Sequence, residues 1–389
     1  MLSREELAAW LCLCESPGLG RAAARRLLSL FGSPEAVLGA TEAAVAAVVG
    51  QRAARALLQP SDRLDALLNA TWDWLSGAPA GPLRAVVPLG DPRYPERLLH
   101  SPDPPLLLYT MGRVELLAAR GIALVGSRHA TPAGRENAYR FARDLSRHHY
   151  VVVSGLALGV DGAAHEGALA EEGSTVAFVG TGLDQVYPPR HAPLAERIGR
   201  EGLLASEYAL GMPPLADNFP RRNRLIAGLT LGTLVVEAAV RSGSLITARE
   251  ALEAGREVFA LPGSIHSPQA RGCHLLIQQG AKLVATVEDI LQELGDPAGD
   301  LPEAPRRRPR GSTRATPVAA EDAGSPESRS DAEDAALLEA LGYDPVPFDQ
   351  LAARTGWTVE RLAARLLQLE LQGRVNRLPG GLLQRSARA

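Results

Sequence analysis

Several apolar runs in the middle of the chain end in glycine, serine or threonine, and this pattern constrains the fold more than any other feature. The runs are rich in β-branched residues and lie within 121–128, 150–155, 176–182, 234–238 and 258–263. Strands this apolar suit a parallel sheet that is buried on both faces. Helical stretches of about 10 to 20 residues separate the runs, which predicts βαβ units and an α/β fold.

The carboxyl ends of these strands are predicted to form a phosphate-binding surface. Ligands of open α/β sheets bind beyond these ends, where small residues let them approach backbone N–H groups. The candidate residues lie at two strand ends and in one arginine-rich segment: Gly126, Ser127, Arg128, Ser154, Gly155, Phe219, Arg221, Arg222, Asn223 and Arg224. An aromatic ring among arginines is typical of sites for unpaired nucleic acid. We expect this arginine-rich segment to be a loop; the alternative is that its arginines are paired with acids.

The chain is expected to contain more than one domain, because 389 residues exceed the usual size of a single core. Residues 1–83 are rich in alanine and leucine and predict helices, and residues 84–295 hold the strands. Residues 296–333 have the composition of a disordered linker. Residues 334–386 predict helices followed by a β-hairpin, the winged-helix pattern. Such a linker cannot support a shared core, so we expect 84–294 to fold and dimerise alone.

Two further segments have the character of nucleic-acid-binding elements. The sequence Ser-Pro-Gly-Leu-Gly at 16–20, followed by 21–28, resembles the turn of a helix–hairpin–helix, in which glycine amides face a phosphate. An ordinary interhelical turn is the alternative. In the winged helix, Arg361, Arg365 and Arg374 are placed to reach DNA phosphates, although such domains also serve as protein-contact modules.

The sequence argues against several enzyme classes. Its one lysine, Lys282, is not in a Gly-Lys-Ser/Thr sequence, which excludes a Walker A loop. The glycines at 180–182 lack the third glycine of a dinucleotide fingerprint. Asp161 and His165 share one helix face, either as a chemical pair or as a structural contact. Ser154 lacks the flanking glycines of a nucleophile elbow. No metal cluster or cofactor is expected.

The cysteines and the hydropathy indicate a cytoplasmic protein. Three cysteines form no CxxC pair and no even disulfide framework, which suits a reducing compartment. The first residues are acidic and helical rather than those of a signal peptide, and no apolar run reaches about 18 residues. We therefore expect no membrane partner.

A series of motifs in the expected order resembles the DNA-processing protein A family, DprA, also called Smf. The matching segments are 91–98, 125–128, 154–161, 180–184, 206–208, 219–228, 236–238, 242–248 and 255–263. The resemblance implies a Rossmann-like central domain, an N-terminal helical domain of the sterile-alpha-motif type and a C-terminal winged helix. It also implies a homodimer that binds single-stranded DNA without catalytic turnover, protects incoming DNA and loads the RecA recombinase in natural transformation and recombination. The turn from Gly126 to Arg128 is implied to grip a DNA phosphate.

Two other functions remain as alternatives. The glycine-rich turn at 242–250 is comparable to that of nucleoside-monophosphate phosphoribohydrolases on a related Rossmann fold, although it lacks their double glycine. Release of adenine from AMP would distinguish such an enzyme. A transcription factor is supported by the winged helix alone, and it would prefer duplex DNA.

Overall fold

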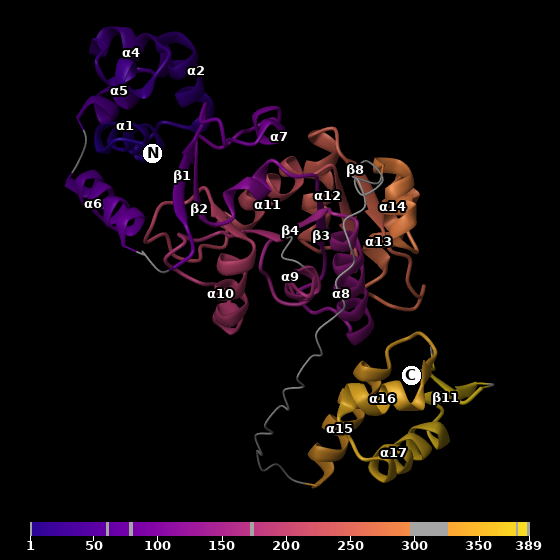
Figure 1. Ribbon diagram of the computed structural model, residues 1–389. Coiled ribbons are helices and arrows are strands. Elements are labelled where there is room, and N and C mark those ends of the chain that lie inside the picture. Colours follow the sequence, from indigo (N-terminus) through magenta and orange to yellow (C-terminus); the bar gives the residue numbers. More distant parts are fainter. Residues whose placement is uncertain are drawn as a thin grey trace, which may run out of the picture.

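The computed structural model describes residues 2–59, 62–77, 81–171, 175–295, 326–378 and 380–386 (Figure 1). Most of the predicted linker, 296–325, lies outside these residues. The remainder, 326–333, belongs to the helix α15 (Pro326–Leu341), so the C-terminal unit begins before the predicted boundary.

The N-terminal region is helical, as the sequence predicts. Its helices are α1 (Arg4–Glu15), α2 (Arg21–Phe31), α3 (Pro34–Leu38), α4 (Glu42–Val49), α5 (Gln51–Leu58) and α6 (Asp62–Ser76). Side chains that accept hydrogen bonds from the first turn start several of them: Ser3 forms a capping box with Glu6, and Ser33 and Thr41 cap α3 and α4. These caps explain why short alanine-rich segments begin at defined residues.

The central region contains one nine-stranded sheet, in the order β1-β2-β6-β5-β4-β3-β7-β8-β9. Its strands are β1 (Arg84–Pro88), β2 (Leu107–Gly112), β3 (Gly121–Val125), β4 (Val151–Ser154), β5 (Thr175–Phe178), β6 (Leu203–Ser206), β7 (Gly232–Val235), β8 (Glu257–Ala260) and β9 (Lys282–Leu283). The strands from β6 to β9 in this order are parallel, whereas β1 and β2 pair antiparallel at one edge. The predicted parallel sheet is therefore confirmed, with an antiparallel edge that the sequence did not reveal.

Helices cover both faces of this sheet, which explains the apolar strands. In β3, Ile122 and Leu124 pack with α8 (Pro132–Arg147), α9 (Val160–Leu169) and α14 (Val287–Leu294). Ala123 and Val125 pack on the other face with residues of α11 (Asn218–Leu229), α12 (Ser244–Glu253) and α13 (Arg271–Gln278). The shorter elements are α7 (Glu96–Leu99), η1 (Val114–Leu117), η2 (Pro189–His191) and α10 (Ala192–Glu201).

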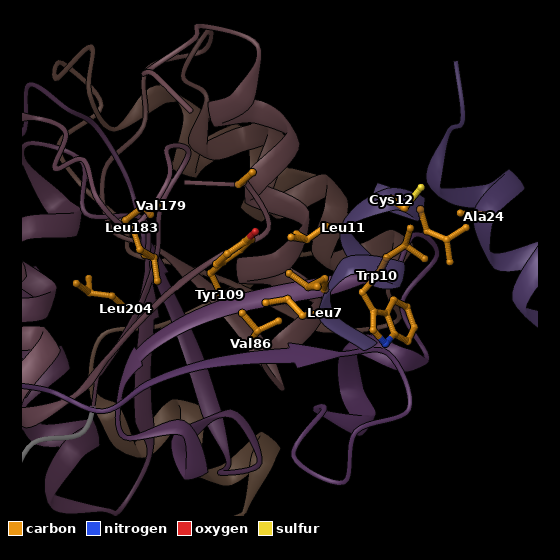
Figure 2. Close-up of a cluster of buried hydrophobic side chains, with 14 of the residues drawn as sticks. Leu7, Trp10, Leu11, Cys12, Ala24, Val86, Tyr109, Val179, Leu183 and Leu204 are labelled. Atoms are coloured by element: carbon orange, nitrogen blue, oxygen red, sulfur yellow. The ribbon is translucent and has the colours of Figure 1, made fainter. Parts of the chain in front are cut away.

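The N-terminal helices share a hydrophobic core with the edge of the sheet (Figure 2). Leu7 and Leu11 of α1 are buried in the same cluster as Val86 of β1 and Tyr109 of β2. The boundary near residue 83 therefore separates two parts of the sequence but not two cores. This shared core argues against the expectation that 84–294 fold alone.

The C-terminal unit has the predicted winged-helix architecture. After α15 come β10 (Val346–Pro347), α16 (Phe348–Thr355), α17 (Val359–Leu371), β11 (Val375–Leu378) and β12 (Leu382–Arg385). The three strands form a separate sheet, β10-β12-β11, and leucines from the helices form a separate core. Of all the helices in the described ranges, none has the length and apolar character needed to cross a bilayer.

Candidate nucleic-acid interface

A cleft opens where the strand order reverses, beyond the carboxyl ends of β3 and β7. The chain runs from β3 to β4 on one side and returns to β7 on the other, so this is the topological switch point of the sheet. The cleft has a volume of about 490 Å³, and among its lining residues Asp161 is the one acid beside Arg128, Arg222 and Arg241. Its lining therefore favours an anionic ligand.

Hydrogen bonds to Glu237 hold the turn after β3 against the neighbouring strand end. The Ser127 amide donates to the Glu237 carbonyl at 2.7 Å, so it is engaged within the protein. The Glu237 side chain accepts from the Thr131 amide at 2.9 Å and from its hydroxyl at 2.5 Å, and Thr131 also caps α8. A side chain at Gly126 would place its Cβ 2.5 Å from Val160. Arg128, by contrast, is exposed at the mouth of the cleft.

Ser154 and Gly155 lie at the end of β4, and neither of them lines the cleft. The buried Ser154 hydroxyl donates to the Leu124 carbonyl at 2.6 Å. Asp161 accepts from the Gly155 amide at 3.1 Å and from the Ala157 amide at 3.3 Å. Burial raises the pKa of Asp161, an effect that Arg222 opposes. These groups hold the backbone at the strand end and are not presented to solvent.

His165 is also engaged in hydrogen bonds to its surroundings. Its Nε2 accepts from the Leu156 amide at 3.3 Å, which assigns the proton to Nδ1, 2.7 Å from the Thr175 hydroxyl. Burial lowers the pKa of His165 to about 3, with smaller contributions from His191 and Arg222. Asp161 and His165 therefore fit the structural alternative rather than a catalytic pair.

The segment 219–224 was expected to be a loop, and this expectation is wrong: it lies in the first half of α11. Pro220 occupies the first turn, where the missing N–H has no helical partner to lose. The Asn218 side chain donates to the Gly180 carbonyl at 3.0 Å and anchors the start of the helix. The hydrophobic residues Leu225, Ile226 and Leu229 then bury one face against the sheet.

Because α11 is a helix, its three arginines point to different surroundings. Arg222 is buried and donates to the Gly155 carbonyl at 2.6 Å and to the Phe178 carbonyl, linking the ends of β4 and β5. Burial lowers the pKa of Arg222 to about 10, and Asp161 counteracts this effect. Arg224 is paired with acids, the alternative given above. Arg221 is exposed.

Two aromatic rings, the exposed Tyr187 and the half-buried Phe219, meet the exposed Arg128 at the mouth of the cleft. The Arg128 guanidinium lies 5.5 Å from the centre of the Phe219 ring. Tyr187, from the loop after β5, packs against Phe219, with 5.4 Å between the centres of the two rings. Arg241 and Asn223 line the cleft nearby.

Sequence reasoning missed Tyr187 and Arg241. The signal for each was its place just after a predicted strand end, in the segments that follow 176–182 and 234–238. Neither belongs to an arginine cluster, so composition alone did not single them out.

Most cations are ion-paired in the two other segments for which the sequence suggested nucleic-acid contacts, the turn at 16–20 with its following helix and the winged helix. Arg21, in the first turn of α2, contacts Asp103 of the central region, which fits an ordinary interhelical turn better than a helix–hairpin–helix. In the winged helix, Arg361 pairs with Glu333 at 2.6 Å, and Arg365 and Arg374 pair with Asp334 at 2.5 and 3.5 Å. These ion pairs weaken the case for DNA contacts by this domain.

Comparison with known proteins identifies the family. The model of the family described as DNA recombination-mediator protein A matches residues 85–295, and the DprA winged helix domain matches residues 320–381. The chain belongs to the DNA recombination-mediator protein A family. This confirms the resemblance to DprA and Smf, and the comparisons do not favour the phosphoribohydrolase alternative.

Relatives and solved structures agree with this assignment. Protein Smf of Escherichia coli K12 is 42% identical over 307 residues, which cover 78% of this chain and 78% of the relative. DNA processing protein DprA of Streptococcus pneumoniae R6 is 47% identical over 203 residues, 52% of this chain and 72% of the relative. The X-ray structure of DprA from S. pneumoniae aligns with a TM-score of 0.65 at 36% identity, covering 75% of this chain and 98% of that one. A DprA structure from Helicobacter pylori, described by its single-stranded DNA binding mode, aligns with a TM-score of 0.50 at 30% identity, covering 54% and 95%.

Proposed function

We propose that this recombination-mediator protein binds single-stranded DNA at the mouth of the switch-point cleft. The observation that carries the proposal is the Arg128 guanidinium stacked on Phe219 beside a cleft lined by further arginines. Arginine next to a partly exposed aromatic ring and a positive groove suits an unpaired strand, whose bases are free to stack. The binding mode described for the H. pylori relative supports the same ligand class.

Each exposed group has a distinct part in this proposal. Arg128, Arg221 and Arg241 contact phosphates, because a guanidinium offers paired donors to phosphate oxygens. Tyr187 and Phe219 offer ring faces to bases, and Tyr187 is 43% exposed. Arg222, Ser154 and Gly155 contribute indirectly, because Arg222 ties α11 to the backbone at the ends of β4 and β5, and Ser154 and Gly155 lie at the end of β4.

A titration with single- and double-stranded oligonucleotides at several salt concentrations tests the proposal. Fluorescence anisotropy should show tighter binding to single strands. The logarithm of the affinity should fall with the logarithm of salt, with a slope of roughly -0.7 for each phosphate neutralised. An affinity independent of salt, or a clear preference for duplex, would contradict this function.

We further propose that the protein acts without catalytic turnover. The support is that Ser154, Asp161 and His165, the groups nearest to a catalytic set, are all engaged in hydrogen bonds that hold the backbone. Incubation with AMP or ATP should release neither adenine nor phosphate. Turnover by a pure sample that disappears when Arg128 is substituted would contradict this proposal.

The partners implied by the resemblance complete the proposal: a homodimer in the cytoplasm that protects incoming DNA and loads RecA. Two clefts on one particle would let a long strand engage both and gain affinity through effective concentration. Light scattering should give twice the chain mass, and affinity should rise with oligonucleotide length beyond one site. RecA should assemble faster on strands covered by single-strand-binding protein when this protein is added. A monomer, or no effect on RecA, would contradict the corresponding partner.

A further inference from the structure

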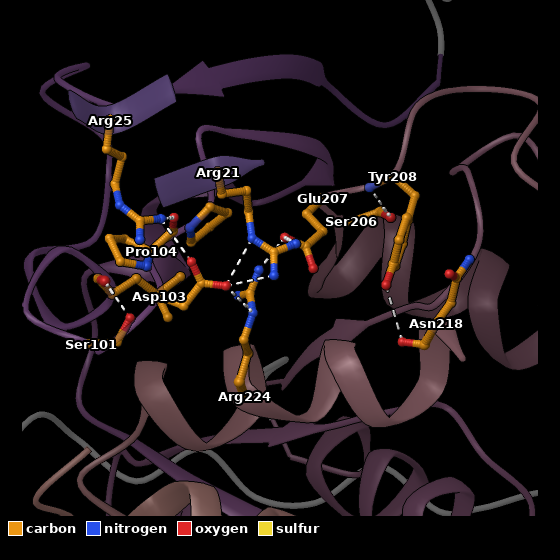
Figure 3. A network of polar contacts seen from close by, with 12 residues as sticks. Arg21, Arg25, Ser101, Asp103, Pro104, Ser206, Glu207, Tyr208, Asn218 and Arg224 are labelled. Atoms are coloured by element: carbon orange, nitrogen blue, oxygen red, sulfur yellow. Dashed lines mark hydrogen bonds and ion pairs between the residues drawn. The ribbon is translucent and has the colours of Figure 1, made fainter. Parts of the chain in front are cut away.

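A partly buried ion-pair network joins the N-terminal helices to α11, and the proposed function does not use it (Figure 3). Asp103, in the loop between α7 and β2, accepts from Arg21 Nε at 2.8 Å and from Arg25 Nη1 at 2.8 Å. Arg21 and Arg25 lie one turn apart on α2. Arg21 also lies 3.4 Å from Glu207, which follows β6. Two arginines of the N-terminal domain thus bind two carboxylates of the central domain.

Arg224 brings α11 into this network. Its guanidinium donates to Glu207, and its Nε lies 3.3 Å from Asp103 Oδ2. The side chains of Glu207 and Arg224 are only 5% and 12% exposed. A charge this shielded from water is unfavourable without its partner, so such a pair fixes the geometry of the elements that carry it. The orientation of α11 is therefore tied to the two carboxylates.

A second contact from the same segment holds the start of α11. Tyr208, which follows the buried glutamate, donates its hydroxyl to the Asn218 carbonyl at 3.2 Å. Asn218 and Arg224 stand on either side of Phe219 and Arg221 in the sequence of the helix. A shift of this segment would therefore move the side chains that contact DNA in the proposed function.

The charge balance of the network depends on the N-terminal domain. The network contains three guanidinium groups and two carboxylates, a sum of +1. Without Arg21 and Arg25, two carboxylates would compete for Arg224 alone, a sum of -1. Burial opposes ionisation of Asp103, but hydrogen bonds from Arg21 and Arg25 outweigh it and lower the pKa of this carboxyl.

We propose that the N-terminal helical domain positions α11 for single-stranded DNA through this network, with Arg21 as the positioning residue. The inference rests on the proposed function, because it gives the network a role at the same site. Arg21 itself does not contact DNA in this account. It acts by keeping Asp103 and Glu207 in the arrangement that holds Arg224.

The test compares Arg21→Ala with Arg26→Ala in the full-length protein. Arg26 lies on the same helix, is exposed and makes no ion pair within the described residues, so it controls for the loss of one positive charge. Hydrogen exchange without DNA should be faster in α11 for Arg21→Ala only. The Kd for a single-stranded oligonucleotide should rise about three- to ten-fold, in the lower part of the range of coupling within one ion-pair network, and stay near wild type for Arg26→Ala. Arg21→Lys, a milder change that keeps the charge, should shift both readouts in the same direction by less.

A thermodynamic mutant cycle tells the positioning of α11 apart from two other effects of Arg21→Ala, a loss of folding and a change in the electrostatic potential around the DNA site. In a background that lacks both α11 side chains proposed to contact DNA, Phe219→Ala with Arg221→Ala, Arg21→Ala should have little further effect on DNA affinity, because the side chains that it positions are gone. Full additivity, or equal effects of Arg21→Ala and Arg26→Ala, would overturn the inference. If the wild-type protein does not bind single strands at all, the proposed function is overturned instead. If hydrogen exchange in α11 is the same in Arg21→Ala as in the wild type, only the positioning role is overturned.

Discussion

Arg128 and Arg361 are both arginines stacked on an aromatic ring, yet we expect them to differ in DNA binding. Arg128 stands at a cleft lined by other cations, whereas Arg361 stacks on Trp357 and is already paired with Glu333. Arg128→Ala should raise the Kd for single strands roughly five- to thirty-fold, which corresponds to about 1 to 2 kcal/mol. Arg361→Ala should leave the Kd nearly unchanged in the same anisotropy titration. A larger effect of Arg361→Ala would move the main site to the winged helix.

Alanine variants of two neighbouring arginines in α11, Arg221 and Arg222, should affect stability and DNA binding differently. Arg222 is 3% exposed and satisfies two backbone carbonyls, so Arg222→Ala leaves these and Asp161 without a cation. We expect the free energy of unfolding to fall by about 3 to 5 kcal/mol. Replacement of the exposed Arg221 by alanine should lower the free energy of unfolding by less than about 0.5 kcal/mol, and it should weaken DNA binding. Urea unfolding and anisotropy on both variants measure the two effects, and a stable Arg222→Ala protein would contradict the structural role.

His165 should make the stability depend on pH in mildly acidic solution. Its pKa is lowered by burial from 6.5 to about 3, so between these values the unfolded chain binds a proton that the folded protein does not. Protonation therefore favours the unfolded state, and stability should fall as the pH decreases from about 6.5 towards 3, by up to about 1.4 kcal/mol per pH unit. Urea midpoints between pH 6.5 and 5 should show this slope in the wild type and a flatter one in His165→Gln. Equal slopes would contradict it.

At the scale of elements, the sequence was informative where one pattern decided the structure. The apolar strands β3, β4 and β7 and the winged-helix order were predictable, because burial on both faces and capped helices leave local signatures. Helix α11 was not, because Asn218, Phe219 and Pro220 look like a turn and its start is fixed by a distant contact to Gly180. The burial of Arg222 and the pairing of Arg224 follow from that helix. The residue types alone predicted a phosphate-binding surface, but they did not predict which arginines are exposed on it.

The contact between the turn after β3 and the start of α9 should be sensitive to a single methyl group. Gly159 has a φ of 80°, and a Cβ there would lie 2.3 Å from the Ser127 carbonyl oxygen. Gly159→Ala should therefore destabilise the protein by about 1 to 3 kcal/mol and weaken DNA binding by displacing Arg128. Gly211→Ala is the matched control, because φ there is 79° but nothing lies within 4 Å of the added Cβ. Equal effects of the two variants on the melting temperature would show that backbone strain alone matters.

At the scale of the whole molecule, the two ends of the chain should differ in how far the central domain depends on them. Leu7 and Leu11 of α1 share a buried cluster with Val86 and Tyr109 of the sheet edge, so removal of 1–83 exposes that face to water.

The winged helix has its own core and, within the described residues, meets α8 through polar contacts of Gln350 and Arg354 with Glu136. Removal of 296–389 should therefore leave the melting temperature and most single-strand binding intact. Removal of 1–83 should give a protein that aggregates or unfolds without cooperativity, because the newly exposed apolar surface no longer contributes to folding. Calorimetry and light scattering on both truncations measure these outcomes. A cooperative, monodisperse fragment lacking 1–83 would show that the sheet edge is stable without α1, and the N-terminal helices would then be an accessory rather than part of the folding unit.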